Sequence, residues 1–166
     1  NFNSGTAGFT SADDAFRGTS QPDYASGAQS STGGAGGTGG VQTTVGGVAA
    51  GTITEMSGGW QSSFTLPSAG EVTLSLDYYV DAHTGYEPDE VFQALVSVDG
   101  VLHGTSPDDF IVDIAGGGTA GWATFTANLG TLSAGSHTIT VGASNTTKKL
   151  TTEIGTETIT IILITT

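Results

Sequence analysis

The clearest pattern along the chain is an alternation of apolar and polar residues with a period of two. In EVTLSLDYYV, residues 71–80, every second residue from Val72 to Val80 is apolar or aromatic, and the other face is mainly polar. The same alternation recurs in residues 91–98, 122–129 and 137–143. Because successive side chains of a β-strand point to opposite faces, each of these segments is predicted to be a half-buried strand.

Further strands are predicted at residues 41–47, 52–56, 60–66 and 110–114. The last segment, TETITIILITT (156–166), is a β-branched run typical of a strand that is buried on both faces. No window combines helical periodicity with a capping box. Glycine-rich turn signals separate the strands, so we predict an all-β protein. The expected fold is a jelly-roll-like antiparallel β-sandwich of about 8–10 strands. It would form a single domain over residues 1–166, with a Gly- and Ser-rich loop at residues 30–40.

Composition narrows the class of protein. The chain has 166 residues, 27 of them glycine, and no cysteine, which suits one domain with a core large enough to fold without disulfides. Acidic residues number 16 against three basic ones, for a net charge of −13. That balance argues against nucleic-acid or anionic-membrane partners, and it favours a secreted protein in a salty or calcium-containing medium. No run approaches the roughly 18 apolar residues of a membrane span. The first residues, NFNSGTAGFT, lack the pattern of a signal peptide, so we expect a mature fragment or an excised module.

The segment DAHTGYEPDE, residues 81–90, concentrates carboxylates between two predicted strands. Oxygen-rich clusters suit Ca²⁺, which takes six to eight oxygen ligands, and Pro88 restricts the backbone within the cluster. Glu87, Asp89 and Glu90 are the proposed ligands, whereas Asp81 is read as a strand-end residue. The alternative is a solvated loop, or one neutralised by Lys148 and Lys149.

Other acidic residues could join this loop if the chain brings them together. Asp13 and Asp14 form one pair, and Glu153 and Glu157 precede or open the final strand. The alternative for Asp13 is an Asx side chain that stabilises a turn.

Exposed aromatic rings can stack on sugars, but tryptophan at the start of a strand is more often part of a core. Trp60 and Trp122, which both follow glycine, are therefore expected to be structural. The candidate ligand-binding residues are those expected in loops, together with the only arginine, a candidate anchor for a carboxylate. They are Arg17, Tyr24, His83 and Tyr86.

Catalysis finds little support in the sequence. The chain has no cysteine, no G-x-S-x-G elbow and no H-E-x-x-H pair. His83, His103 and His137 lie far apart, and His137 is expected to pack at a strand corner. The prediction is that the protein is not an enzyme.

Several stretches together resemble a known type of module. They are FNSGTAGFTSADDAFRGTSQPDYASG, MSGGW, GYEPDEVFQALVSVDGVLHGTSPDDFIVDIAG, GWATFTANLGTLSAGSHTITVGASNTTKK and the later TE-rich strand. In their order and spacing they resemble a β-sandwich module of large secreted or surface proteins of marine bacteria, including adhesins and polysaccharide-degrading enzymes. The LSAGSHTITV corner is also similar to jelly-roll carbohydrate-binding modules.

The resemblance implies a non-catalytic extracellular or cell-surface module, often with bound calcium. The positions that match its acidic motifs are Asp13, Asp14, Glu87, Asp89, Glu90, Glu153 and Glu157. One departure is the final strand, where TITIILITT stands in place of an expected Asp pair, so one metal site of the family is in doubt.

Three hypotheses follow. The first is a calcium-dependent module that binds carbohydrate, either a polysaccharide or a cell-surface glycan, as a monomeric part of a larger protein. The second is an adhesin module that binds a peptide or protein, capturing a C-terminal carboxylate through the metal. The third is a structural spacer that calcium makes rigid.

Overall fold

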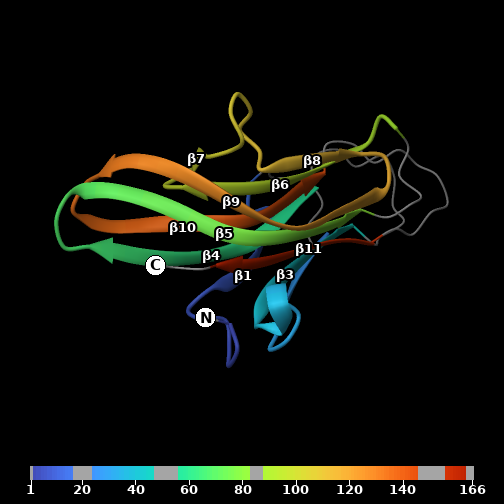
Figure 1. The fold of residues 1–166 in the computed structure, drawn as a ribbon, viewed down its shortest axis with the longest axis horizontal. Coiled ribbons are helices and arrows are strands. Elements are labelled where there is room, and N and C mark those ends of the chain that lie inside the picture. The colour runs from blue at the N-terminus through green and yellow to red at the C-terminus, as the bar shows by residue number, and fades with distance from the viewer. Residues whose placement is uncertain (1, 17–23, 47–55, 83–87, 146–155, 164–166) are drawn as a thin grey trace.

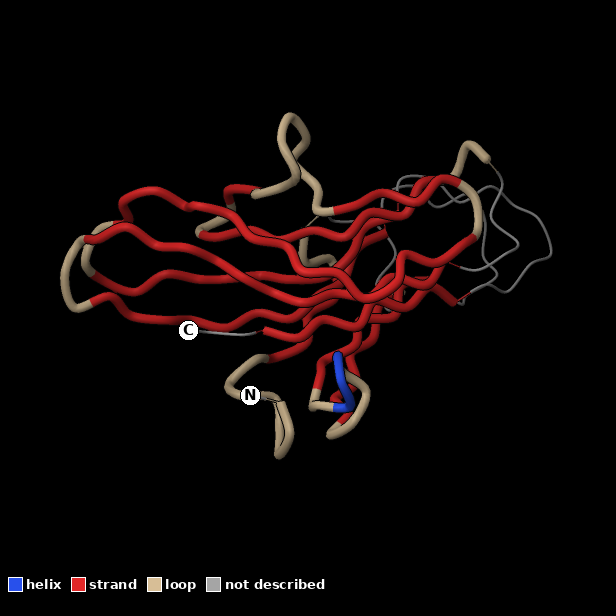
Figure 2. The backbone as a smooth tube through the Cα atoms, in the orientation of Figure 1, coloured by secondary structure: helices blue, strands red, loops and turns tan. Residues whose placement is uncertain are grey.

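The computed structural model describes residues 2–16, 24–46, 56–82, 88–145 and 156–163 of the chain. Two antiparallel sheets face each other in this part of the molecule, with the long strands running along its longest dimension (Figure 1). Strands dominate the tube view in Figure 2, and the helical content of the described part is one short 3₁₀ turn. That turn, η1 (Ala35–Gly37), lies inside the predicted Gly-rich loop. The described residues include no helix long and apolar enough to cross a membrane.

The first sheet has the strand order β1-β4-β10-β6-β7, and β8 also pairs with β6. Its strands are β1 (Thr10–Asp13), β4 (Met56–Leu66), β6 (Val91–Val98), β7 (Val101–Leu102), β8 (Val112–Ala115) and β10 (Gly135–Asn145). The second sheet has the order β2-β3-β11-β5-β9. Its strands are β2 (Ala25–Ser30), β3 (Gly40–Gly46), β5 (Gly70–Ala82), β9 (Gly118–Leu132) and β11 (Thr156–Leu163).

This arrangement confirms the predicted all-β antiparallel sandwich. The predicted strands at 71–80, 91–98, 122–129 and 137–143 correspond to β5, β6, β9 and β10. Sequence reasoning missed β1, β2 and β7, because short strands without alternation give no periodic signal. The prediction at 52–56 lies almost entirely outside the described residues, apart from Met56, which begins β4. The final segment forms β11 in the middle of its sheet, between β3 and β5, as a strand rich in β-branched residues would.

The core lies between the two sheets and is built from the apolar faces that the alternation indicates. In β6, Phe92, Ala94, Val96 and Val98 are all buried, as predicted. The fully buried large side chains of the described part include Phe2, Met56, Leu76, Val80, Val41 and Val45. Each such side chain contributes about 1.5–3 kcal/mol when it leaves water.

The outer face of the first sheet is also partly covered. Leu95, on the face of β6 that points away from the core, is 1% exposed, and Ser144 of β10 is 0% exposed. The segment after β1 contributes to this cover, because the backbone amide of Asp14 donates to the carbonyl of Ser57 and that of Phe16 donates to its hydroxyl. A strict alternation of buried and exposed residues therefore fails for β6, where both faces are buried.

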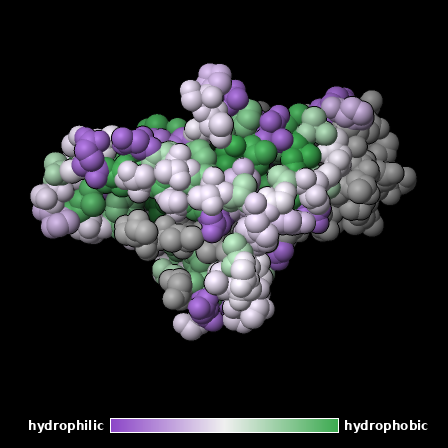
Figure 3. All heavy atoms as spheres, viewed as in Figure 1, coloured by the Kyte–Doolittle hydropathy of each residue, from purple (hydrophilic) through white to green (hydrophobic). Residues whose placement is uncertain are grey.

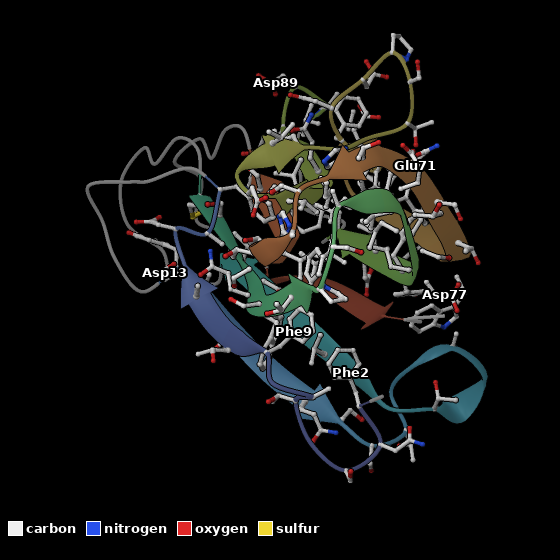
Figure 4. The ribbon with its side chains drawn as sticks, turned by 90° about the vertical axis from the view of Figure 1, so that its left-hand side faces the viewer. Phe2, Phe9, Asp13, Glu71, Asp77 and Asp89 are labelled. Carbon is white, nitrogen blue, oxygen red and sulfur yellow. The ribbon has the colours of Figure 1, made fainter. Side chains whose placement is uncertain are left out.

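The N-terminal segment packs against the turn between β2 and β3. Phe2 is 1% exposed and its ring meets that of Phe9 edge to face, with centroids 5.7 Å apart (Figure 4). The Asn3 side chain accepts a hydrogen bond of 2.6 Å from the backbone amide of Gly39. A side chain at Gly39 would collide with the Phe2 backbone, so glycine permits this close approach.

Candidate functional site

The acidic loop that the sequence singles out is only partly described. Asp81 lies near the end of β5 and is exposed, which agrees with its interpretation as a strand-end residue. Asp89 is exposed, whereas Glu90 is 7% exposed and its carbonyl accepts a hydrogen bond from Gly116. The two neighbouring carboxylates thus stand in different environments. His83, Tyr86 and Glu87 lie outside the described residues, so their predicted roles stay predictions.

The other proposed metal ligands are spread over the molecule. Asp13 is exposed at the end of β1, and in Figure 4 it and Asp89 belong to separate parts of the fold and do not point toward each other. Asp14 adopts a left-handed backbone conformation with φ 52°, which Asp tolerates better than most residues. Arg17 and Glu153 lie outside the described residues, and for Glu157 only its backbone position in β11 is described.

A calcium site therefore cannot be assembled from the described residues alone, because they include no group of three or more His, Asp or Glu side chains placed to hold a metal. Residues 83–87 of the acidic loop lie outside the described residues, so whether Asp13 and Asp14 join that loop stays a prediction. The calcium prediction rests on the sequence.

Tyr24 requires a correction. It is expected among the ligand-binding loop residues, but its side chain is 6% exposed and belongs to the core cluster. The aromatic ring contributes to packing between the sheets, which its apolar area favours over exposure.

The two tryptophans, which look alike in sequence, have opposite environments. Trp60 is 5% exposed, and its indole N–H donates a 3.0 Å hydrogen bond to the carbonyl of Gln42, so the structural interpretation is confirmed for this residue. Trp122 is 41% exposed, so the structural interpretation is wrong for it. Among the described residues it is one of two large apolar side chains that are exposed, the other being Val101.

Trp122 has an aromatic neighbour on the adjacent strand. Its ring lies 5.7 Å from that of Tyr79, centroid to centroid, with 45° between the ring planes. The ladder between β5 and β9 is irregular here, since Tyr78 pairs with Ala123 and Val80 with Ala120. This β-bulge gives β9 an extra residue opposite Tyr79, and bulges of this kind re-aim side chains.

Polar pairs continue from the aromatic pair along the same face of β5 and β9. Thr124 donates a 2.5 Å hydrogen bond to the Asp77 carboxylate, and the hydroxyls of Ser75 and Thr126 are 3.5 Å apart. Near the far end, the Thr131 hydroxyl donates to the Glu71 carboxylate. Glu71 and Asp77 are labelled in Figure 4. We call this surface the β5–β9 face; it comprises Glu71, Ser75, Asp77, Tyr79, Trp122, Thr124, Thr126 and Thr131.

The β5–β9 face combines two kinds of chemistry. An exposed indole beside a phenol offers a flat apolar surface with polar edges. The neighbouring hydroxyls and carboxylates both accept hydrogen bonds, and the hydroxyls also donate them. A ligand that suits this face has an apolar side and many hydroxyl groups.

Sequence reasoning could have found this face. The alternation in 122–129 assigns Ala123, Phe125, Ala127 and Leu129 to the core, so Trp122 falls on the outward face by parity. The expectation that Trp122 is structural followed the general preference of tryptophan for cores, although the parity of its own strand indicates an exposed position. No sequence signal joins Trp122 to Tyr79, because their contact depends on the pairing of β5 with β9.

Two hollows accompany this architecture in the described part of the chain. One, of about 400 Å³, lies between the sheets and is lined mainly by apolar side chains such as Phe9, Phe64 and Leu66. The other, of about 570 Å³, runs beside β9 and is lined by residues 102–106 and 124–128. The second shares Thr124 and Thr126 with the β5–β9 face, and the first shares Ser75 with it.

A buried histidine fixes two turns on the opposite sheet. The His137 ring is 5% exposed and stacks on Phe64 at 5.3 Å between centroids. Its Nδ1 lies 2.7 Å from the Asp99 carboxylate, and its Nε2 lies 2.9 Å from the carbonyl of Ser133. The hydrogen bond to Asp99, and then that to Ser133, raise the pKa of His137. The same bond and the amide of Thr138 lower the pKa of Asp99. This pair has a structural role and confirms the expected packing of His137 at a strand corner.

Comparison with known proteins gives matches among solved structures only. No protein-family model matches the chain, and no curated protein matches it. The carbohydrate-binding module TmCBM61, solved in complex with β-1,4-galactotriose, is 11% identical with a TM-score of 0.44, over 95% of this chain and 90% of that one. The K1 cleaved adhesin domain of Lys-gingipain from Porphyromonas gingivalis W83 is 13% identical with a TM-score of 0.42, over 99% and 96%.

A third match is the CBM22-1 xylan-binding domain from Paenibacillus barcinonensis Xyn10C. It is 12% identical with a TM-score of 0.39, over 100% of this chain and 92% of that one. Over nearly its whole length, the chain is similar to carbohydrate-binding modules and to an adhesin domain.

Proposed function

We propose that this chain is a non-catalytic, extracellular carbohydrate-binding module whose ligand lies on the β5–β9 face. The observation that carries the proposal is Trp122, which is 41% exposed and paired with Tyr79 at 5.7 Å on a strand whose other large apolar side chains are buried or half-buried. Leaving a tryptophan ring in water forfeits the free energy of burying it, about 25 cal/mol per Å² of apolar area. A ligand that covers the ring recovers that free energy.

The polar part of the face suits hydroxyl recognition. Asp77 and Glu71 each accept a hydrogen bond from a threonine of β9, and a carboxylate has further acceptor sites that remain available. Hydrogen bonds from a sugar hydroxyl to an ionised carboxylate are stronger than those between neutral groups. The face therefore offers stacking at one end and charge-assisted hydrogen bonds along its length.

The ligand of this face is proposed to be a neutral glycan. Both charged side chains on the face are carboxylates, and the three basic residues of the chain, Arg17, Lys148 and Lys149, lie outside the described residues. Uronic acids or sulfate esters would face like charges at Asp77 and Glu71, which costs binding free energy.

The test is binding of the whole chain to neutral polysaccharides by isothermal titration calorimetry and affinity electrophoresis. β-1,4-Galactan, xylan and mixed-linkage β-glucan form the panel, because ligands of these kinds accompany solved neighbours. We expect Trp122→Ala to weaken binding about tenfold or more, which corresponds to about 1.4 kcal/mol, without lowering the melting temperature.

Val101→Ala is the matched control, since Val101 is exposed in β7 and is not part of the β5–β9 face. It should bind as the wild type does. Equal affinities for Trp122→Ala and the wild type would remove the β5–β9 face from the proposal, and no binding to any glycan would remove the function.

Calcium dependence is a further part of the proposal and rests on the acidic loop. What supports it is the net charge of −13 together with the carboxylates of residues 81–90. Of the proposed ligands, Asp89 is exposed at the surface, whereas Glu90 is buried. In this proposal calcium orders the loop, and glycan binding at Trp122 does not require it.

A further inference from the structure

The longest edge strand in the described part of the chain is β9. Of the strands in the described part of the chain, β9 is the longest at 15 residues, and it ends the order of its sheet. The other strands at the edges of the two sheets are short: β1 and β8 have four residues each, β2 has six and β7 has two. Short edges resist pairing with other chains, but a long one does not.

The sequence of β9 lacks the usual protection of an edge strand. GTAGWATFTANLGTL contains no charged residue and no proline. Natural proteins place lysine, proline or inward-pointing charges on long edges to prevent pairing with other strands. Their absence from β9 marks this edge as one that is compatible with an added strand.

The edge is also accessible. Residues 121–124 are all exposed, although alternate side chains of this segment point toward the core side. A Cβ built on Gly121 would meet no atom within 4 Å. Among the described residues, the backbone hydrogen bonds that lie outside strand ladders include none from residues 122–128. Apart from its ladder with β5, this stretch has no backbone partner there.

A groove of about 570 Å³ lies along this edge, between residues 124–128 and a wall formed by residues 102–106. Internal hydrogen bonds hold the wall: the backbone amide of Thr105 donates to Phe110, and its hydroxyl donates to the carbonyl of Ile111 at 2.9 Å. Gly104 packs so closely on the Phe110 backbone that a Cβ would collide with it. The loop above the groove projects from the sandwich in Figure 1 and is mainly polar in Figure 3.

We propose that an extended peptide of a partner protein, carrying lysine or arginine, adds as a strand to the β9 edge and lies in this groove. The free amides and carbonyls of an edge strand match the backbone of another extended chain at every second residue. The stretch 124–128 spans about 17 Å at ~3.4 Å per residue, which accommodates about five residues of peptide.

Charge decides between a basic peptide and a second copy of this chain. The loop and strand that follow the groove wall bear Asp108, Asp109 and Asp113, all exposed. A basic peptide is attracted to them, whereas a second copy would bring another net charge of −13. This inference stands on the edge of β9 and does not depend on glycan binding at its outward face.

The test uses a fluorescent peptide of alternating threonine and valine with a lysine at each end, measured by fluorescence anisotropy on the whole chain. We expect saturable binding that weakens about tenfold or more when alternate peptide nitrogens are methylated, because methylation removes strand hydrogen bonds and keeps the side chains. Replacing both lysines with glutamate should weaken binding by a similar factor. Amide hydrogen exchange in residues 124–128 should slow when the peptide is bound.

Two variants separate this site from the glycan face. Ser106→Tyr fills the groove from its wall and should abolish peptide binding, while Val101→Tyr, with the same side chain at an exposed position outside the groove lining, should not. Trp122→Ala should weaken glycan binding and leave peptide binding unchanged. If Ser106→Tyr destabilises the fold, the double variant Asp108→Lys, Asp109→Lys serves in its place and should weaken binding of the basic peptide.

Equal binding of the methylated and unmethylated peptides would overturn strand addition. Loss of glycan binding in Ser106→Tyr, without any peptide binding by the wild type, would instead assign the groove to carbohydrate. Elution of the free chain as a dimer that Ser106→Tyr converts to a monomer would assign the edge to a second copy.

Discussion

His137 shows how one side chain can join two turns that are far apart in the sequence. Both of its ring nitrogens face acceptors, the Asp99 carboxylate and the Ser133 carbonyl, so the protonated ring satisfies both at once. Asp99 also accepts a hydrogen bond from the backbone amide of Thr138. The turn after β6 and the turn before β10 are thus held by one imidazolium.

This geometry predicts a pH-dependent contribution to stability. The pKa of His137 is raised on folding, so its contribution is complete below the unfolded value of about 6.5 and is lost as pH rises through the folded pKa. The pKa of Asp99 is lowered, so its contribution is present above about 3.9 and is lost as pH falls through the folded pKa. The difference in melting temperature between the wild type and His137→Gln should be largest near pH 5 and smaller at pH 8.

Thermal melts at pH 5, 6.5 and 8 measure this difference. His103→Gln is the control, because His103 has no part in the Asp99 pair. A difference for His137→Gln that is the same at all three pH values would show that the ring acts only through packing on Phe64.

Single residues also show what sequence patterns can and cannot predict. The core faces of β5 and β6 follow from alternation, because burial and parity act on each strand separately. The role of Trp122 does not follow from the preference of tryptophan for cores, since its exposure is set by its place in β9. Tyr24 lies in a loop just before β2, as expected, but its side chain is buried in the core between the sheets, which the position of a residue in a loop does not indicate.

At the scale of elements, the two layers meet closely where β2 packs on β4. Gly27 of β2 lies over the Trp60 ring, and a Cβ there would stand 2.7 Å from Cζ2 of Trp60 and 2.5 Å from the Cβ of Ser11. The indole N–H donates to the carbonyl of Gln42 in β3, so Trp60 is held against two neighbouring strands of the second sheet, β2 and β3. Glycine at residue 27 is therefore a requirement of packing.

Gly27→Ala should destabilise the protein by about 1–3 kcal/mol, because overpacking forces the strands apart. Chemical denaturation gives the free energy of unfolding directly. Gly70→Ala, in β5 where a Cβ meets no atom within 4 Å, is the matched control and should stay within about 0.5 kcal/mol of the wild type. Equal effects of the two substitutions would mean that β2 shifts freely on β4.

Element pairing is also where sequence reasoning reached its limit for the site. Strands β5 and β9 are each recognisable from alternation, but nothing in either segment indicates that they are neighbours. The β5–β9 face, with Asp77 next to Thr124 and Tyr79 next to Trp122, exists only through that pairing. Long-range antiparallel contacts of this kind depend on the packing of the whole sandwich.

At the scale of the whole molecule, the excess of negative charge opposes compactness. With a net charge of −13 and 16 acidic residues, the folded chain carries self-repulsion that bound cations or salt relieve. The described residues include no lysine or arginine.

Calcium should raise the melting temperature relative to the same protein in chelator. A cation that binds only the native state stabilises that state by about 2.7 kcal/mol when the free cation concentration is 100 times the Kd. Differential scanning calorimetry with calcium and with EDTA measures this shift, and Asp89→Asn should reduce it. Asp113→Asn, an exposed carboxylate of β8, should not reduce it. An unchanged midpoint in calcium and EDTA would contradict the calcium proposal.

The β5–β9 face has a consequence for how the protein can be assayed and divided. Its hydrogen-bonded pairs join residues that are 47 to 60 positions apart in sequence. No peptide cut from either strand carries both halves of the β5–β9 face. Ligand binding therefore requires the native pairing of β5 with β9 and is lost when that pairing is lost. A glycan that binds this face would, by the same linkage, hold the two strands together and slow the local opening of β9.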